Sequence, residues 1–586
     1  MSHSNKMNMQ RLLYILIVML MLTACDHNLD LKPVDKLSPE NAFNTEKDLQ
    51  LYANSFYLDL PDGNEIVRGD ELSDYLVGRT PSTYIYGSFG ATQATGWSWG
   101  ALRKVNYFLQ HAPHAKITAE AMNHYLGLAR FFRAWFYFDK VKQFGDVPWY
   151  GKALEVNDPE LFKPRDPRTL VMDSILADLD FACANLRSVK DKDASTVTRW
   201  VALAFKSRVC LFEGTFRKYQ TQLGLSATAN KWLDESIKAA DDLMKSNQYK
   251  LLTGAPDKNY RDLFTLEVPN TTEVLLAAVN SKSLRVFNDA NWYWTSATYG
   301  GRFSFIKKFI NTYLKIDGTP FTAQAGYNNI PFNEEVKDRD LRLRQSIRMG
   351  NYTRDGAIAP PDFTYTYSGY MPIKLTLDAK ATDGVAENYN SLPIIRYAEV
   401  LLNFAEAKAE RGTFTTADWD ATIALLRKRA GITSTPYPLT ADNYLQQNYY
   451  PDITNPVLLE IRRERGIELS LEGFRYDDLK RWRAGKLLEN QYDGMYVPAL
   501  NTLIDLNEDN KMDVSFVESI PATKVPGVYY FLIDNVQYKL SGGTSGNLIL
   551  FSNLARKYED YKYFYPIPYN EIILNSNLEQ NPGWSN

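Results

Sequence analysis

The sequence predicts a mostly α-helical protein in which paired helices form a scaffold and one loop-rich region carries short β-strands. Apolar residues recur at three- and four-residue spacing through most of 98–246 and again through 392–485, as they do on the buried side of a helix. Between about 249 and 391 this spacing is lost. Short strand-type runs such as EVLLAAV (273–279) stand there among residues rich in Asn, Gly, Tyr and Trp. We therefore expect loops of this region to carry recognition on a helical framework.

The first 24 residues have the pattern of a bacterial secretion signal. Lys6 and Arg11 precede an apolar run from 12 to 22, which suits a signal-peptide core and is too short to span a bilayer. The sequence Leu-Thr-Ala-Cys resembles the lipobox of bacterial lipoproteins, in which Cys25 is lipidated and becomes the first residue of the mature protein. Residues 25–41 would then be the lipidated cysteine and an extended tether. Ordinary secretion with an unmodified cysteine is the alternative.

The remaining chain, 42–586, reads as a single body, because no Pro/Gly/Ser-rich linker divides it. Removal of the signal takes away two basic residues and no acidic ones, so the formal net charge changes from -3 to -5. A negative net charge disfavours nucleic acid and anionic lipid as ligands. Cys183 and Cys210 lie in apolar helical contexts and are expected to be buried free thiols.

The scaffold is expected at about 42–248 and 392–485, followed by C-terminal loops and a short helix in 486–586. A first helix should open at Ser38 and run through Tyr57. In the helix at 118–143, Phe131, Trp135 and Phe138 form one apolar stripe beside another, so it should bury more than one face. Pairs of helices at intervals of about 30 to 40 residues resemble tetratricopeptide repeats. Helices are predicted at 98–112, 118–143, 167–186, 199–217, 228–246, 396–411, 416–430 and 455–472.

The stretch EIRRERGIELSLEGFRYDDLKRW (460–482) mixes charged and apolar residues on every side. Asn455 and Pro456 suit a helix start, and Gly473 suits a helix end. Some of its arginines and glutamates must then be partly buried, and buried charge is tolerated when it is paired and hydrogen-bonded. A solvated surface helix is the alternative.

Candidate ligand-binding residues cluster in the loop-rich region. Flat aromatic faces can pack on the C–H face of a pyranose, while amides, carboxylates and guanidinium groups bind its hydroxyls. The two tryptophans at 292 and 294 would point to opposite faces of an extended segment, so one would stack on sugar and the other would anchor the loop. Ordinary core or interface aromatics are the alternative. The candidates are Asp289, Asn291, Trp292, Tyr293, Trp294, Tyr299, Arg302, Tyr365, Tyr367, Tyr370 and, more weakly, Trp97.

One metal site and no catalytic site is suggested. Asp505, Asn507, Asp509, the Lys511 carbonyl and Asp513 match positions 1, 3, 5, 7 and 9 of a calcium loop, but the glycine at position 6 and the glutamate at position 12 are missing. A metal-free loop of Asx turns is the alternative, so calcium is at most structural and no cofactor is required. No histidine lies beyond His124, which leaves few choices for a catalytic base.

Four stretches together resemble the SusD/RagB family of outer-membrane nutrient-binding lipoproteins. They occur in the family's order, and the resemblance covers almost the whole mature chain. The stretches are LGLARFFRAWFYFDKVKQFGDVPWY (126–150), LPIIRYAEVLLNFAEAKAERG (392–412), RRERGIELSLEGFRYDDLKRW (462–482) and YFYPIPYNEIILNSNLEQNPGW (563–584).

This resemblance implies a SusD-like fold and a surface-exposed lipoprotein of the outer membrane. Such a protein captures oligosaccharide or polysaccharide and delivers it to a SusC-like TonB-dependent transporter, without catalysis. The resemblance also implies several acyl chains on Cys25, palmitate among them, and more than one chain is what stable anchoring requires. Two alternatives stay open: an oligopeptide-binding protein like the RagB branch, and a surface glycoside hydrolase.

Overall fold

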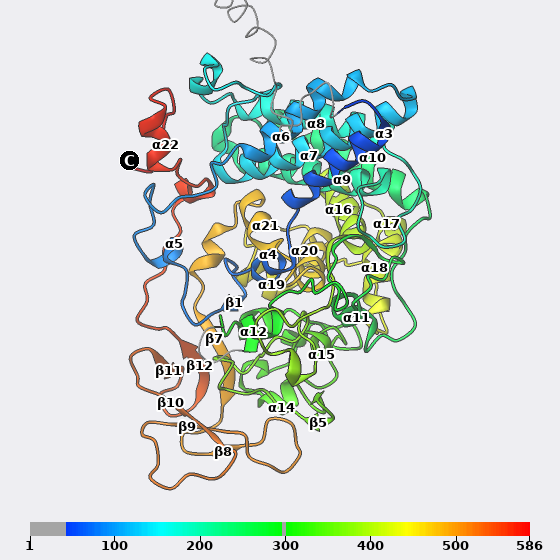
Figure 1. The fold of residues 1–586 in the computed structure, drawn as a ribbon. Coiled ribbons are helices and arrows are strands. Elements are labelled where there is room, and N and C mark those ends of the chain that lie inside the picture. Colours follow the sequence, from blue (N-terminus) through cyan, green and yellow to red (C-terminus); the bar gives the residue numbers. More distant parts are fainter. Residues whose placement is uncertain (1–42, 296–299, 586) are drawn as a thin grey trace, which may run out of the picture.

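Helices fill one end of the molecule and most strands lie at the other (Figure 1). The computed structural model describes residues 43–295 and 300–585. Its first layer of helices packs as successive pairs, α7 against α8 and α9 against α10, and the latter pair continues onto α16 and α20. This pairing is the scaffold that the helical spacing predicts.

The first layer agrees with the predicted helices to within two residues at each end. Its helices are α6 (Gly100–His111), α7 (Ala119–Phe144), α8 (Arg168–Asn185), α9 (Arg199–Tyr219) and α10 (Ala229–Lys245). Side chains of Thr118 and Thr198 cap α7 and α9 by accepting hydrogen bonds from backbone amides of the first turn. Phe131, Phe138 and Phe132 of α7 are all buried, so this helix does bury more than one face.

The first helix starts later than the sequence suggests. Residues 43–45 are not helical, and α3 (Glu46–Ala53) begins after Thr45, which forms a capping box with Asp48. Residues 38–42 lie outside the described part of the chain. A second short helix, α4 (Gly63–Arg68), starts at a similar capping box between Asp62 and Glu65.

The second group of helices carries the charged stretch, and two of its boundaries differ from the prediction. The predicted helix at 416–430 is broken at Thr422, where the backbone leaves helical geometry (φ -130°, ψ -86°). The predicted helix at 455–472 ends at Glu468, and Leu471 and Gly473 beyond it have positive φ. The group comprises α16 (Tyr397–Glu410), α17 (Thr416–Ala421), α18 (Ile423–Arg429), α20 (Pro456–Glu468) and α21 (Arg475–Arg481).

The charged residues of α20 are buried and paired, as the sequence predicts. Arg463 contacts Asp442, Arg465 pairs with Asp478 at 2.8 Å, and Glu468 contacts three arginines from other elements. Those arginines are Arg342, Arg396 and Arg429. A solvated surface helix is therefore excluded for α20. Through these ion pairs α20 is connected to the loop-rich region, to the strand that holds Arg396 and to α18.

The loop-rich region contains many very short elements. The predicted strand forms as β2 (Val274–Ala278) and pairs antiparallel with β6 (Leu392–Arg396). A second pair, β1 (Leu76–Val77) and β3 (Ser304–Phe305), fixes the end of the 288–303 segment to the N-terminal part of the chain. The remaining elements are α5 (Thr83–Tyr86), α11 (Asn259–Thr265), α12 (Ala290–Thr295), α13 (Lys307–Ile310), α14 (Phe332–Glu335), α15 (Leu343–Ser346), β4 (Thr353–Arg354), β5 (Ala357–Ile358) and α19 (Asn443–Asn448).

The C-terminal part contains sheets where the sequence suggested only loops and a short helix. The short helix is α22 (Tyr569–Leu574). The sequence pattern does not predict these strands, because each spans six residues or fewer between turn residues. Two three-stranded sheets form, with the orders β11-β12-β7 and β10-β9-β8. Their strands are β7 (Tyr492–Val497), β8 (Leu503–Ile504), β9 (Val514–Val517), β10 (Tyr529–Leu532), β11 (Tyr538–Leu540) and β12 (Gly546–Leu550).

Cys183 and Cys210 are free thiols, Cys210 buried and Cys183 partly buried. Burial raises the pKa of the Cys183 thiol to about 12, which keeps it protonated and unreactive. Within 43–295 and 300–585, every helix is too short or too polar to cross a bilayer.

Candidate functional site

The segment with the densest candidates is a short helix, not the extended strand that the sequence suggested. The carboxamide oxygen of Asn288 accepts a hydrogen bond from the Ala290 amide (3.0 Å) and so starts α12. Trp294 is 3% exposed and packs its ring on Phe303, with centroids 5.5 Å apart. Trp292 is partly exposed. Trp294 is thus the anchor, and Trp292 is the tryptophan that stays open to solvent.

Asn291 and Asp289 hold the segment in place. The fully buried Asn291 side chain donates to the Leu377 carbonyl (2.8 Å) and accepts from the Leu377 amide (2.7 Å) and the Asn388 side chain (2.6 Å). The Asp289 carboxylate accepts from the Ala386 amide (2.6 Å). Asn291 therefore has its polar atoms committed to the protein.

Tyr293 projects from the same helix toward α4. Its hydroxyl donates to the Glu71 carboxylate, and the guanidinium of Arg68 lies 4.8 Å from its ring centroid. Burial and the Glu71 charge raise the pKa of this hydroxyl, so it stays a donor. The backbone oxygen of Tyr293 accepts from the Gly301 amide (2.8 Å), which brings Tyr293 beside the end of the loop.

Arg302 and Tyr367 are brought together although they are far apart in the sequence of the loop-rich region. The guanidinium carbon of Arg302 lies 4.4 Å from the Tyr367 ring centroid, and one of its nitrogens donates to the Phe363 carbonyl (3.0 Å). Tyr367 in turn stacks on Tyr538 of β11, with centroids 6.2 Å apart and planes at 21°. Sequence reasoning missed Tyr538.

We define the aromatic cluster as Tyr293, Arg302, Tyr367, Tyr529 and Tyr538. Tyr529 of β10 joins it through Phe363, whose ring it stacks on at 6.3 Å. All members except Tyr367 are partly exposed, and Tyr367 is 8% exposed. The hydroxyls of Tyr367, Tyr529 and Tyr538 have no hydrogen-bond partner among the described residues. The cluster thus offers ring faces together with unused donors and acceptors.

Three further candidates lie apart from this cluster or inside the core. Residues 363–365 form a turn closed by hydrogen bonds to Asp362, so Tyr365 and Tyr367 do not share a strand face as expected. Tyr370 is fully buried and donates to Glu335 (2.6 Å), which is a core role. Trp97 lies beside α6 and is 7% exposed, whereas Trp99 is partly exposed. Tyr299 lies outside the described residues.

The suggested calcium loop joins β8 to β9, and its carboxylates bind backbone amides. Asp505 accepts from the amides of Asn507 (3.1 Å), Glu508 (2.7 Å) and Asn510 (2.8 Å), as in an Asx-turn loop. Burial and two neighbouring carboxylates raise the pKa of Asp513 to about 6. Among the described residues, no three Asp, Glu, His or Cys side chains are grouped closely enough to hold a metal. Calcium binding here stays a prediction.

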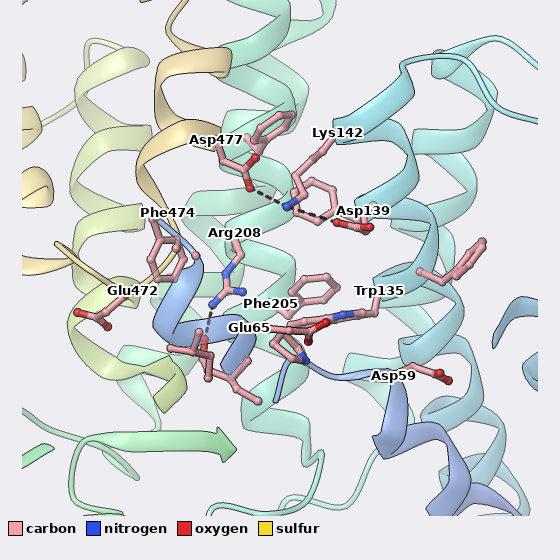
Figure 2. Close-up of a pocket in the computed structure, with 18 of the residues that line it drawn as sticks. Asp59, Glu65, Trp135, Asp139, Lys142, Phe205, Arg208, Glu472, Phe474 and Asp477 are labelled. Atoms are coloured by element: carbon pink, nitrogen blue, oxygen red, sulfur yellow. Dashed lines mark hydrogen bonds and ion pairs between the residues drawn. The ribbon is translucent and has the colours of Figure 1, made fainter. Parts of the chain in front are cut away.

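A cleft of about 930 Å³ separates the first helical layer from α4 and α21. Figure 2 shows Trp135 and Asp139 on α7 facing Phe474 and Asp477 across it, with Arg208 of α9 between them. Trp135 stacks on Phe205 at 4.5 Å. The cleft therefore has aromatic walls and both signs of charge.

Most charges of the cleft are already paired. Lys142 bridges to Asp477 at 2.6 Å (Figure 2), and Arg208 pairs with Glu399 at 2.6 Å. Asp139, whose side chain is 63% exposed, is paired only loosely, with Lys142 at 3.9 Å. Unused hydrogen-bonding groups are thus sparser here than in the aromatic cluster.

Comparison with known proteins gives a family match over residues 280–584, slightly more than half the chain, to the model of the SusD family. Two curated proteins of Formosa agariphila are similar. SusD-like protein P38 is 24% identical over 498 residues, which is 80% of this chain and 90% of that protein. SusD-like protein P2 is 23% identical over 496 residues, with the same coverage.

Solved structures share the fold. A SusD-like protein from Bacteroides fragilis superposes with a TM-score of 0.68 at 21% identity, covering 94% of this chain and all of that one. A SusD-like carbohydrate binding protein from the same species also gives 0.68 at 21% identity, covering 92% of this chain and 99% of that one. The mostly α-helical fold expected from the sequence is thereby confirmed.

Proposed function

This chain belongs to the SusD family, and from this premise we propose that it binds a glycan at the aromatic cluster and delivers it to a TonB-dependent transporter. A structural relative is described as carbohydrate binding, which supports a glycan as the ligand. The cluster supports the location. It combines exposed ring faces with free hydroxyls and a guanidinium, the groups that bind the two faces of a sugar.

One observation carries the proposal: Arg302 lies over Tyr367 while Tyr367 stacks on Tyr538. The stack holds the guanidinium and two rings in fixed relative positions before any ligand arrives. A preorganised site loses less side-chain entropy on binding than a flexible one. Binding then comes from stacking and hydrogen bonds and involves no chemical step.

The delivery part of the proposal depends on the lipid anchor and on a partner. Cys25 and the tether lie outside the described residues, so their support is the lipobox sequence alone. A protein held by acyl chains at the outer membrane, with a tether of more than a dozen residues, can stay close to a transporter while it binds and releases cargo.

Oligopeptide cargo is a second candidate because of the cleft. Beside Trp135, Asp139 offers an exposed carboxylate that is only loosely paired with Lys142 at 3.9 Å, and it would suit a basic group next to an apolar peptide side chain. A glycoside hydrolase is less well supported, because neither the cluster nor the cleft presents a pair of unpaired carboxylates facing each other among the described residues.

A glycan array probed with the mature protein tests the proposal. The wild type should bind one or a few related polysaccharides, and Arg302→Ala should lose most of that signal. Asp139→Asn serves as the matched control, because it changes the cleft and leaves the cluster intact. Binding to peptides instead, abolished by Asp139→Asn, would replace the proposal with the peptide alternative.

A further inference from the structure

A second cavity, of about 490 Å³, lies at the end of the molecule where α6 and α22 are found (Figure 1). Three segments far apart in the chain enclose it: α6 with the turn before it, residues 148–162, and α22 with the residues that follow. Strands β10 and β11 of the aromatic cluster lie toward the other end of the molecule (Figure 1). This cavity is therefore separate from the proposed glycan site.

The floor of the cavity is apolar and built from rings. Trp97, Leu102, Tyr150 and Leu578 line it and are each less than one-tenth exposed. Trp99 stands edge-on between Trp97 and Tyr150, with centroid distances of 5.4 Å and 5.5 Å and interplanar angles of 83° and 84°. Such a set of perpendicular rings suits the face and edge of one more planar ring.

The rim of the cavity leaves apolar side chains in water. Val156, Phe162 and Leu574 line the cavity and are 87%, 54% and 70% exposed. A ligand that covers apolar surface and removes it from water gains about 25 cal/mol of binding free energy per Å². Exposed apolar side chains at the rim of a cavity of this size are typical of a ligand site.

Polar groups at the rim carry both signs of charge and have free hydrogen-bonding positions. The indole nitrogen of Trp99 and the carboxylates of Glu155 and Glu571 have no partner among the described residues, and Arg103 makes one long bond (3.3 Å) to a carbonyl. Lys152 also lines the cavity, but its ammonium is already paired with two carboxylates. A hydroxyl can donate to a carboxylate and accept from a guanidinium or an indole, so a neutral polyhydroxylated group matches this rim.

We propose that this cavity binds an aromatic ring that carries a sugar, as in an aryl glycoside or a glycan decorated with an aromatic ester. The aromatic ring fills the floor against Trp97, Trp99 and Tyr150. The sugar hydroxyls lie at the rim, between Arg103 on one side and Glu571 on the other. The inference rests on the proposed function only in that the ligand carries sugar.

Gly100 gives a direct way to close the cavity. It lines the cavity as the first residue of α6, and a Cβ built there meets no atom within 4 Å. Gly100→Phe should therefore place a ring in the space intended for the ligand and leave the fold intact, which a thermal melt verifies.

Calorimetric titrations of wild type and Gly100→Phe with 4-nitrophenyl β-D-glucopyranoside, 4-nitrophenyl β-D-galactopyranoside and their methyl counterparts test the proposal. For at least one sugar, the nitrophenyl glycoside should bind wild type at least about tenfold tighter than the methyl glycoside does. The affinity of Gly100→Phe for that nitrophenyl glycoside should be at least about tenfold lower than that of wild type. Glu571→Gln should weaken nitrophenyl glycosides and spare 4-nitrophenol. Equal affinities for aryl and methyl glycosides, or unchanged binding by Gly100→Phe, would overturn the proposal.

Two further outcomes separate this site from the proposed function. Arg302→Ala should keep nitrophenyl glycoside binding unchanged, because it alters only the aromatic cluster. Retained nitrophenyl binding by a protein that binds no polysaccharide on the array would overturn the proposed function and leave this site standing. A different outcome is that a membrane protein copurifies with wild type but not with Gly100→Phe, while wild type binds no aryl glycoside. That result would identify the cavity as a protein-docking site and overturn this inference.

Discussion

Arg396 on β6 and Glu468 on α20 form a buried ion pair, with Nη1 and Oε1 2.6 Å apart and both side chains at most 1% exposed. The same carboxylate also pairs with Arg342 (2.8 Å) and contacts Arg429. Burial alone would raise the pKa of Glu468, but the three arginines together hold it well below its usual range. Glu468 is thus a carboxylate shared by three buried cations, which also pair with other carboxylates, at the junction of the helical group and the loop-rich region.

Glu468→Ala should destabilise the protein strongly, because it leaves three guanidinium groups buried without their shared counter-charge. Removing one partner of a buried pair typically costs about 3 to 5 kcal/mol in the free energy of unfolding. Urea denaturation followed by circular dichroism measures this. Glu518→Ala, at an exposed glutamate, is the control and should shift the midpoint little. A Glu468→Ala midpoint equal to the control would contradict this account of α20.

The sequence indicated this burial correctly because charged and apolar residues alternate around 460–468, so no purely polar side remains for water. It did not indicate the partners. Arg342 and Arg396 lie 126 and 72 positions away from Glu468, and their approach depends on the packing of the whole loop-rich region. Local pattern predicts that a helix forms and which residues it buries, whereas contacts across long loops depend on tertiary structure.

Trp294→Ala should lower stability while Trp292→Ala leaves it nearly unchanged. Trp294 is 3% exposed against Phe303, and large-to-Ala changes in cores cost about 3 to 5 kcal/mol. Its indole nitrogen is buried without a hydrogen-bond partner in the described structure, so Trp294→Phe should recover most of the loss. Thermal melts of the three variants check this. A larger destabilisation by Trp292→Ala than by Trp294→Ala would reverse the assignment of anchor and open residue.

Asp493 on β7 should make stability depend on pH between its ordinary pKa of 3.8 and about 6. Burial raises its pKa from 3.8 to about 6, although the Lys308 amide donates to it at 3.1 Å. Stability from the protonated carboxyl is fully present below its ordinary pKa and is lost as pH rises through about 6. Asp493→Asn cannot titrate, so it should gain stability relative to wild type between pH 4 and pH 8, by on the order of 2 kcal/mol.

Denaturant midpoints of the two proteins measured at both pH values give that difference. The Asn carboxamide keeps an acceptor for the Lys308 amide, so the variant isolates the charge. A difference between the proteins that does not change with pH would contradict a raised pKa for Asp493.

Cys25→Ala should release the protein from the outer membrane. More than one acyl chain is what holds a lipoprotein stably, and the variant cannot be acylated at this position. Labelling cells with a palmitate analogue and separating membrane from soluble fractions checks both points. An unlabelled wild type, or a Cys25→Ala protein that stays in the membrane fraction, would refute the lipid anchor.

The aromatic cluster could be foreseen only in part. Composition directed attention to Tyr293, Arg302 and Tyr367, because Trp, Tyr and polar residues are dense there. Tyr529 and Tyr538 come from strands of four and three residues in a part that reads as loop, and no local pattern brings them beside Arg302. Tyr370 has the composition of a ligand residue but is enclosed by the core, a distinction that spacing alone cannot make.

The central claim is that the ring stack under Arg302 binds glycan. The most direct measurement is a calorimetric titration of the polysaccharide that gives the strongest array signal into wild type, Tyr538→Ala and Tyr437→Ala. Tyr437 is a matched control, since it is partly exposed and stacks on Phe414 at 6.5 Å in a different core cluster. Loss of a ring in a binding site typically costs about 2 kcal/mol, so Tyr538→Ala should weaken binding about thirtyfold and Tyr437→Ala should match wild type. Wild-type affinity in Tyr538→Ala would contradict the claim.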